Sequence, residues 1–271
     1  MSDTPDNHVI VRAATYNLHE GGLDGEGTEP DEKDDSRLQQ QVDTLSRLDL
    51  DLIGLQEAKW SYLGNDRLKR VADLLGMTYY FLAPSNFYGC DIAVFARPGD
   101  NLTVVNTRQL TGPPWVHTLI NVHLEIAGLD VHFLVGHSAP SGPTARLAEA
   151  EMAAVHRDLN VIYAADFNAA AEDDDPDTTG IDPVKAASKL DKRPARTLTA
   201  NGFYNIGRIC QDPIPTVGHG APNETRNNQL AYRCDRILTT LPECVTGYGV
   251  ELGADDLSDH RPVWAEFALG Q

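Results

Sequence analysis

Short apolar runs alternate with amphipathic segments along the first third of the chain. The runs at 9–16 and 50–55 have the length and composition of buried strands. A helical pattern with one apolar face follows each of them, starting at Ser36 in the first case and covering 67–75 in the second. Gly76 predicts the end of the second helix. The order strand, helix, strand, helix is therefore predicted.

After residue 77 the pattern changes to successive strand-like stretches separated by short turns, which favour antiparallel pairing. These stretches cover 78–82, 91–96, 102–110, 116–126 and 129–135. The remainder predicts a helix at about 144–159, a strand at 161–165, a helical stretch ending near 201–202, and strands at 233–239, 245–252 and 262–269. We predict an α/β fold, a layered sandwich around a mainly antiparallel β core.

Length and composition favour one domain. The 271 residues contain no Pro/Gly/Ser-rich linker, so we expect a polar tail at 1–8 and a single domain at 9–271. A hydrophobic fraction of 41% supports a sizeable core, and no apolar run approaches the length of a membrane span. The N-terminal residues lack the features of a secretory signal, so a cytoplasmic location is expected. The four cysteines show no Cys-x-x-Cys spacing and are expected to be reduced thiols.

The charge is strongly acidic. With 22 Lys and Arg against 40 Asp and Glu, the formal net charge is −18. This argues against a broad electrostatic grip on nucleic acid, because the chain repels a phosphate backbone at long range. A phosphate substrate is still compatible with this charge, since a bound divalent cation is often the largest local charge in such a site.

Polar groups stand beside five of the apolar segments. The runs are Ala-Thr-Tyr-Asn17, Gly-Leu-Gln-Glu57, Gly-His137, Ala-Asp166-Phe-Asn168 and Ser-Asp259-His260. Each run alone is a common turn or cap sequence. If the apolar segments are strands, however, their polar neighbours emerge at strand ends, where open α/β sheets place their ligand crevices. The five runs together predict one dispersed site.

The order of these runs resembles the endonuclease/exonuclease/phosphatase superfamily, the DNase I-like fold, from Thr15 to the end of the chain. The resemblance implies a four-layered α/β sandwich in which two packed, mainly antiparallel sheets are flanked by helices. It also implies that Glu57, Asn17 and Asp259 face a metal ion. By the same resemblance Asp166 positions or deprotonates the attacking water, and Asn168 holds the phosphate.

The resemblance extends to the histidines. It implies that His260 contacts the scissile phosphate and that Asp235 pairs with His260. His137 resembles the histidine of the family's Thr-His-Leu motif, although its flanking residues differ. Other departures are Ala165, where a glycine is usual, and Arg236, where many members carry an aromatic residue. Arg146 lies at about the distance at which many members carry an arginine; a helix-surface or salt-bridging role is an equal alternative.

Elementary chemistry supports the same site. Cleavage of a phosphate ester requires neutralised phosphoryl charge, a water placed in line and a stabilised leaving oxygen. The hard oxygen ligands of Glu57, Asn17 and Asp259 suit Mg²⁺, with Mn²⁺ as the alternative, rather than Zn²⁺. A histidine oriented by a carboxylate, as His260 would be by Asp235, stays charged and can donate to a phosphate oxygen. No Ser-His or Cys-His pairing indicates a covalent intermediate.

We therefore expect a divalent-metal-dependent hydrolase that cleaves phosphodiester bonds of nucleic acid or nucleotides by attack of an activated water. A phosphomonoesterase acting on a small phosphorylated metabolite or nucleotide is the alternative. A catalytically inactive binding protein of the same fold is a third hypothesis, which the complete set of site residues disfavours. The expected partner is a phosphate-ester substrate; no membrane association is expected and no protein partner can be inferred.

Other polar and aromatic features are interpreted structurally. His19 and Glu20, like the acidic runs at 24–35 and 172–177, are expected in solvated loops. Trp60 and Tyr88 are expected to be packed rather than to stack on a base. The local basic cluster is expected to be helix-surface charge; it comprises Lys185, Lys189, Lys192, Arg193 and Arg196. Six further histidines show no ligand spacing and are assigned no role; they are His8, His117, His123, His132, His156 and His219.

Overall fold

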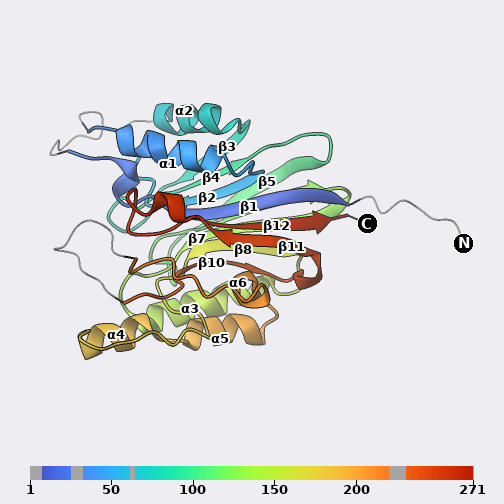
Figure 1. Cartoon of the computed structure of the whole chain (residues 1–271). Helices are drawn as coiled ribbons and strands as arrows, with labels where there is room; N and C mark the ends of the chain where they lie inside the picture. The colour runs from blue at the N-terminus through green and yellow to red at the C-terminus, as the bar shows by residue number, and fades with distance from the viewer. Residues whose placement is uncertain (1–7, 26–32, 62–64, 220–229, 271) are drawn as a thin grey trace, which may run out of the picture.

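Two six-stranded sheets form the centre of the protein (Figure 1). The computed structural model describes residues 8–25, 33–61, 65–219 and 230–270. Residues 1–7 of the predicted tail and 26–32 of the acidic run lie outside the described residues. The first sheet has the order β11-β12-β1-β2-β4-β3, with β1 Val9–Asn17, β2 Leu52–Gln56, β3 Tyr79–Ala83, β4 Ile92–Ala96, β11 Val245–Val250 and β12 Val263–Leu269. The second has the order β5-β6-β7-β8-β10-β9, with β5 Leu102–Leu110, β6 Leu119–Ile126, β7 Leu129–His137, β8 Val161–Asp166, β9 Tyr204–Asn205 and β10 Asp235–Thr239.

Strand pairing is mainly antiparallel, as the short turns predicted. Each sheet also contains one parallel pair, β1 with β2 and β7 with β8. A helical connection joins the strands of each parallel pair, because such strands need a long crossover. The chain passes from the first sheet to the second between β4 and β5. The predicted strand at 116–126 starts only at Leu119, because the residues before it form a turn in which the Trp115 amide donates to the Gly112 carbonyl.

The main core lies between the two sheets. Side chains alternate across each strand, so every second residue faces the opposing sheet. In β1 the inward residues include Val11 and Ala13, whereas Ala14 and Tyr16 face the helices on the outer side. The sheets approach closely at Gly54 of β2, where an added Cβ would lie 2.5 Å from Cγ1 of Val135. Glycine at this position therefore permits close packing of the two sheets.

Helices cover the outer faces of both sheets and complete the four layers (Figure 1). The first sheet is covered by α1 (Ser36–Ser46) and α2 (Asp66–Leu75), and α2 ends at Gly76 in left-handed conformation with φ 67°. The second is covered by α3 (Pro143–Ala153) and α5 (Arg193–Ala200), with α4 (Pro183–Lys189) and α6 (Ile206–Ile209) beside them. The predicted helical stretch ending near 201–202 is divided into α4 and α5. The α6 helix and β9 were not predicted, because each is too short to show a periodic pattern. The predicted four-layered sandwich is confirmed.

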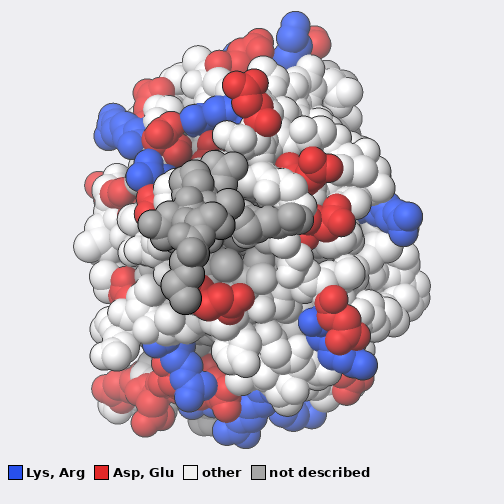
Figure 2. Space-filling model, turned by 90° about the vertical axis from the view of Figure 1, so that its right-hand side faces the viewer, with Lys and Arg blue, Asp and Glu red and all other residues white. Residues whose placement is uncertain are grey.

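Both termini of the described fold lie at the same end of the sandwich. The start of β1 pairs with the end of β12, and β1 runs from there toward the other end (Figure 1). On the terminal face, Lys and Arg side chains lie beside Asp and Glu side chains rather than in a separate basic patch (Figure 2). Among the described residues, no helix combines the length and apolarity that crossing a membrane requires.

Candidate active site

Four polar residues meet at the end of the sandwich opposite the termini. Asn17 ends β1, His137 ends β7, Asp166 ends β8 and Asp235 begins β10. Each is an even number of positions from the inward-facing core residues of its strand, so the alternation of side chains along the strand directs it between the sheets. The registers match as well, because Asp166 is aligned with His137 on one side and with Asp235 on the other. The predicted placement at strand ends is thus observed.

Asp166 is the hub of this group. Its carboxylate is buried, and Oδ2 accepts hydrogen bonds from Asn17 Nδ2 (3.1 Å) and from Asn168 Nδ2 (3.3 Å), with His137 Nε2 also at 3.3 Å. Oδ1 accepts from the backbone amide of Asn168 at 2.8 Å. Burial alone would raise the pKa of Asp166, but the charge of His260 and the hydrogen bond from His137 hold it well below the ordinary value. Asp166 is therefore an anion at neutral pH.

The half-buried His260 forms a pair with the buried Asp235. Nδ1 of His260 lies 2.8 and 3.1 Å from the two oxygens of Asp235, and Nε2 lies 4.0 Å from Oδ2 of Asp166. Burial favours the neutral imidazole, but the two carboxylates outweigh it and raise the pKa of His260 well above its ordinary value. The imidazole is therefore held as a cation with Nδ1–H donating to Asp235 and Nε2–H turned toward the Asp166 side.

The segment that carries Asp259 is attached to β1. The hydroxyl of Ser258 donates to the backbone carbonyl of Asn17 at 2.8 Å and accepts from the His260 amide at 3.1 Å. These two bonds hold the half-buried Asp259 segment beside the end of β1. Ser258 was part of the sequence motif without a role of its own, and here it fixes the register of the segment.

Glu57 follows β2 directly and is half-buried. Its backbone has φ 55°, a left-handed conformation that is uncommon for a residue with a side chain and that clusters at functional sites. One carboxylate oxygen accepts from the Glu20 amide at 3.0 Å, and the other lies 3.5 Å from Asn17 Nδ2. No described Lys, Arg or His forms an ion pair with Glu57. The predicted solvated loop at His19 and Glu20 is thus half-buried against the site.

His137 stacks on a second histidine. The rings of His137 and His117 are parallel to within 1°, with centroids 4.1 Å apart. Burial and the neighbouring His137 lower the pKa of His117 to about 2, so His117 is neutral. The buried Glu149 carboxylate accepts hydrogen bonds from the backbone amides of Val116 and Ala139 and thereby joins the segments that carry the two rings. The sequence interpretation did not connect His117 with His137, and the structure places the two rings in contact.

Asn168 also has a left-handed backbone, with φ 50°. Its carboxamide is bonded at both ends, because Nδ2 donates to the Ser138 carbonyl (3.1 Å) as well as to Asp166, and Oδ1 accepts from Lys189 Nζ at 2.8 Å. The helix-surface interpretation is wrong for Lys189, which is half-buried at the end of α4. The buried Arg146 donates to the carbonyls of Ala139 and Ser188, so it joins the loop after β7 to the end of α4 and does not lie on the helix surface.

Four donor atoms, contributed by Asp166, Cys234, Asp235 and His260, lie within 4.8 Å of one another and form a possible metal site. Their protonation argues against a cation there. Burial raises the pKa of Cys234 to about 12, so its sulfur is a thiol that donates to Asp166 Oδ1 at 3.0 Å. His260 is already a cation. The Glu57 carboxylate, on which no described Lys, Arg or His forms an ion pair, fits a hard divalent ion better. Beside it, Asn17 turns Nδ2 toward Glu57 and Asp166, and its Oδ1 accepts from the His19 amide at 3.0 Å.

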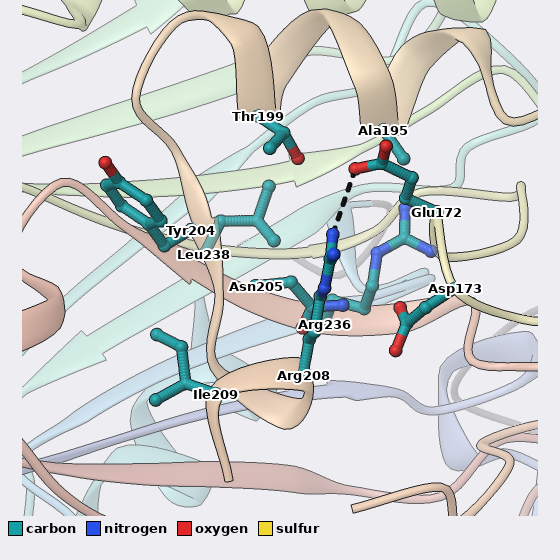
Figure 3. A pocket seen from close by; sticks show the side chains of 10 residues that line it. All are labelled: Glu172, Asp173, Ala195, Thr199, Tyr204, Asn205, Arg208, Ile209, Arg236 and Leu238. Carbon is teal, nitrogen blue, oxygen red and sulfur yellow. Dashed lines mark hydrogen bonds and ion pairs between the residues drawn. The ribbon is translucent and has the colours of Figure 1, made fainter. Parts of the chain in front are cut away.

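Arg236 lies on the other side of β10 from Asp235. Its guanidinium stacks on the Phe167 ring at 4.5 Å and donates to the carbonyls of Ala169 and Arg233. It borders a cavity of about 380 Å³ between β10, α5 and α6, where Arg208 bridges to Glu172 (Figure 3). Arg236 therefore braces the loop after Asn168 from behind and takes no part in the cluster around Asp166.

The predictions for the two aromatic residues have different outcomes. Trp60 is packed as expected, fully buried with its Nε1 donating to the Gly21 carbonyl at 3.0 Å. Tyr88 is 80% exposed, so the packed interpretation is wrong for it. Its ring meets Phe87 edge to face, Phe87 meets His117 in the same way, and His117 stacks on His137. A continuous series of rings thus connects the site with the surface.

Solved structures of other proteins share this fold. The sequence has no significant match among curated proteins. Three similar structures have low sequence identity and therefore show the fold alone. An endonuclease/exonuclease/phosphatase from Beutenbergia cavernae has a TM-score of 0.71 at 17% identity, covering 96% of this chain and 72% of that chain. An AP endonuclease from Archaeoglobus fulgidus has a TM-score of 0.66 at 19% identity, covering 95% and 99%. A mannosyl-6-phosphatase from Bacteroides thetaiotaomicron has a TM-score of 0.62 at 16% identity, covering 94% and 98%.

The family assignment comes from the sequence match. The model of the Endonuclease/Exonuclease/phosphatase family matches residues 14–260, which includes every site residue predicted above. Members of this family are metal-dependent phosphoesterases. The protein thus belongs to the endonuclease/exonuclease/phosphatase family.

Proposed function

We propose that the protein is a divalent-metal-dependent phosphodiesterase that acts on nucleic acid or nucleotides. The observation that carries this proposal is the charge separation at Asp166 and His260, where a buried carboxylate and a half-buried imidazolium lie 4.0 Å apart at the end of the sandwich. Such a pair can hold a water by its carboxylate and a phosphate oxygen by its imidazolium. Hydrolysis of a phosphate ester needs both functions.

The metal belongs with the oxygen donors. We propose Mg²⁺, with Mn²⁺ as a substitute, held by Glu57 together with Asn17 and Asp259. When bound, the ion neutralises phosphoryl charge and polarises the phosphate oxygens. The hydrogen bond from the Glu20 amide orients the Glu57 carboxylate, which supports this assignment.

The remaining residues have complementary proposed roles. Asp166 positions the water, since its depressed pKa keeps it anionic and the surrounding donors fix its two oxygens. His260 donates Nε2–H to the phosphate while Asp235 fixes the orientation of the ring. Asn168 orients Asp166 through Nδ2; a contact with the phosphate would require one Nδ2 hydrogen to leave its present acceptor, the Ser138 carbonyl or Asp166. His137, supported by the neutral His117, lies on the opposite side of Asp166 and can meet the leaving oxygen.

The exposed Tyr88 ring supports a nucleic-acid or nucleotide substrate, because exposed aromatic rings offer a stacking surface to bases. The net charge of −18 supports the second candidate, a phosphomonoesterase for a small phosphorylated metabolite, because a long polyanion is repelled. The structural neighbours include both an AP endonuclease and a mannosyl-6-phosphatase.

A substrate panel tests the proposal. Purified protein is assayed with Mg²⁺, with Mn²⁺ and with chelator on bis(4-nitrophenyl) phosphate, 4-nitrophenyl phosphate, single- and double-stranded DNA, RNA, nucleoside monophosphates and inositol phosphates. We expect metal-dependent diester cleavage that Asp166→Asn and His260→Ala abolish and that Asp130→Asn, a surface control 76% exposed in its side chain, leaves intact. Phosphate release from monoesters alone would favour the second candidate. Equal activity in wild type and both site variants would reject the site.

A further inference from the structure

The ammonium group of Lys189 contacts the carboxamide of Asn168. Its Nζ donates to Asn168 Oδ1 at 2.8 Å and to the Pro140 carbonyl at 3.0 Å. The other members of the local basic cluster differ from it, because Lys185 is exposed and Arg193 pairs with Asp191. Lys189 thus joins the α4 helix to the loop that follows Asp166.

The surrounding structure fixes Lys189 in this place. Its own carbonyl accepts from the Ala170 amide at 2.9 Å, two residues beyond Asn168. The preceding carbonyl, of Ser188, accepts from the buried guanidinium of Arg146. The backbone of Lys189 is therefore held from both sides, and its position at the end of α4 places the ammonium group against Asn168 Oδ1 and the Pro140 carbonyl.

The contact determines which way the Asn168 carboxamide points. With Lys189 on Oδ1, both hydrogens of Nδ2 are directed at acceptors, the Ser138 carbonyl and Asp166 Oδ2. A flipped carboxamide would set Nδ2–H against the ammonium and Oδ1 against the Asp166 carboxylate, so donor would face donor and acceptor would face acceptor. The ammonium also polarises the amide, which strengthens Nδ2–H as a donor toward an anion.

We propose that Lys189 is a positioning residue of the phosphoesterase site, acting through Asn168 to hold the carboxamide in the orientation that orders Asp166. This proposal rests on the function proposed above. Lys189 removal should lower kcat by roughly one to two orders of magnitude, as the loss of one hydrogen bond to a charged group would, with a smaller change in KM.

The kinetic test is a double-mutant cycle. Lys189→Met is measured in wild type and in Asn168→Ala, with Lys185→Met, an exposed lysine on the same helix, as the matched control. We expect a fall in kcat for Lys189→Met, no fall for Lys185→Met, and no additional fall when Lys189→Met is added to Asn168→Ala. An undiminished effect of Lys189→Met in the Asn168→Ala background would overturn the proposal, because Lys189 would then act on the substrate directly.

A measurement without catalysis separates this proposal from the proposed function. The side-chain ¹⁵Nδ2 signals of Asn168, identified by their loss in Asn168→Ala, should shift in Lys189→Met and stay in place in Lys185→Met. Signals that do not move in Lys189→Met would refute the positioning role even in an active enzyme. A wild type without phosphoesterase activity would instead reject the proposed function, while the Asn168 signals would still report the contact.

Discussion

Replacing Asp235 by asparagine should move the alkaline limb of the pH–rate profile. The substitution removes the charge that lies 2.8 Å from His260 Nδ1 but keeps an oxygen there to accept its proton. A hydrogen bond to a charged group is worth about 1.5–3 kcal/mol, and about 1.4 kcal/mol corresponds to one pKa unit. The pKa of His260, which the two carboxylates hold well above its ordinary value, should therefore fall toward that value.

The sign follows from the proposed role of His260 as a donor. Because the imidazolium is the active form, kcat/KM should decline as pH rises through the pKa of His260, and in Asp235→Asn this decline should begin at lower pH. Stopped assays on bis(4-nitrophenyl) phosphate between pH 5 and about 10 measure the shift. The control is Asp130→Asn, which removes an exposed carboxylate 2.9 Å from His123 and the same unit of charge. An alkaline limb that is identical in wild type and Asp235→Asn would refute the assignment of His260 as the titrating donor.

Three further predictions concern the metal, the core and the pair of His260 with Asp235. Glu57→Gln should weaken Mg²⁺ binding about tenfold or more in isothermal titration calorimetry; unchanged affinity would place the ion elsewhere. Gly54→Ala should lower the free energy of unfolding in urea by about 1–3 kcal/mol, because its Cβ would lie 2.5 Å from Val135, and Val135→Ala should restore part of the loss. The His260 pair should stabilise the fold fully below the ordinary imidazole pKa of about 6.5, and that contribution should disappear as pH rises through the raised pKa of the folded state. Urea unfolding of wild type and Asp235→Asn across this range measures it, and a stability difference independent of pH would contradict it.

The strand-end residues could be predicted because one local rule determines them. An apolar run predicts a strand, and the alternation of side chains then assigns the polar residue at its end to one face. Asn17 and Asp166 have the same parity as the core residues of β1 and β8, and the two side chains meet although 149 positions separate them. The order of such strand ends is also what carries the family resemblance.

His117 and Lys189 could not be predicted in this way, because both lie outside strands and their positions depend on long-range contacts. His117 precedes β6, and only the register of the β6–β7 hairpin, in which Leu119 aligns with Gly136, brings it beside His137. Lys189 belongs to a seven-residue helix with no periodic pattern, and it is held by Arg146 from α3. A register argument applied to the predicted hairpin would have identified His117, whereas no local signal indicates Lys189.

The depressed pKa of Asp166 and the raised pKa of His260 are consequences of one network. Asp166 is buried and His260 is half-buried, and withdrawal from water alone would favour the neutral form of both, so each ion persists because the other and the surrounding polar groups compensate it. Removing Asp235, Asn17 or Asn168 should therefore change the protonation of the whole cluster rather than of one group. Kinetic effects of paired substitutions in this network should fall short of the sum of the single effects, and additive effects would show that the residues act independently.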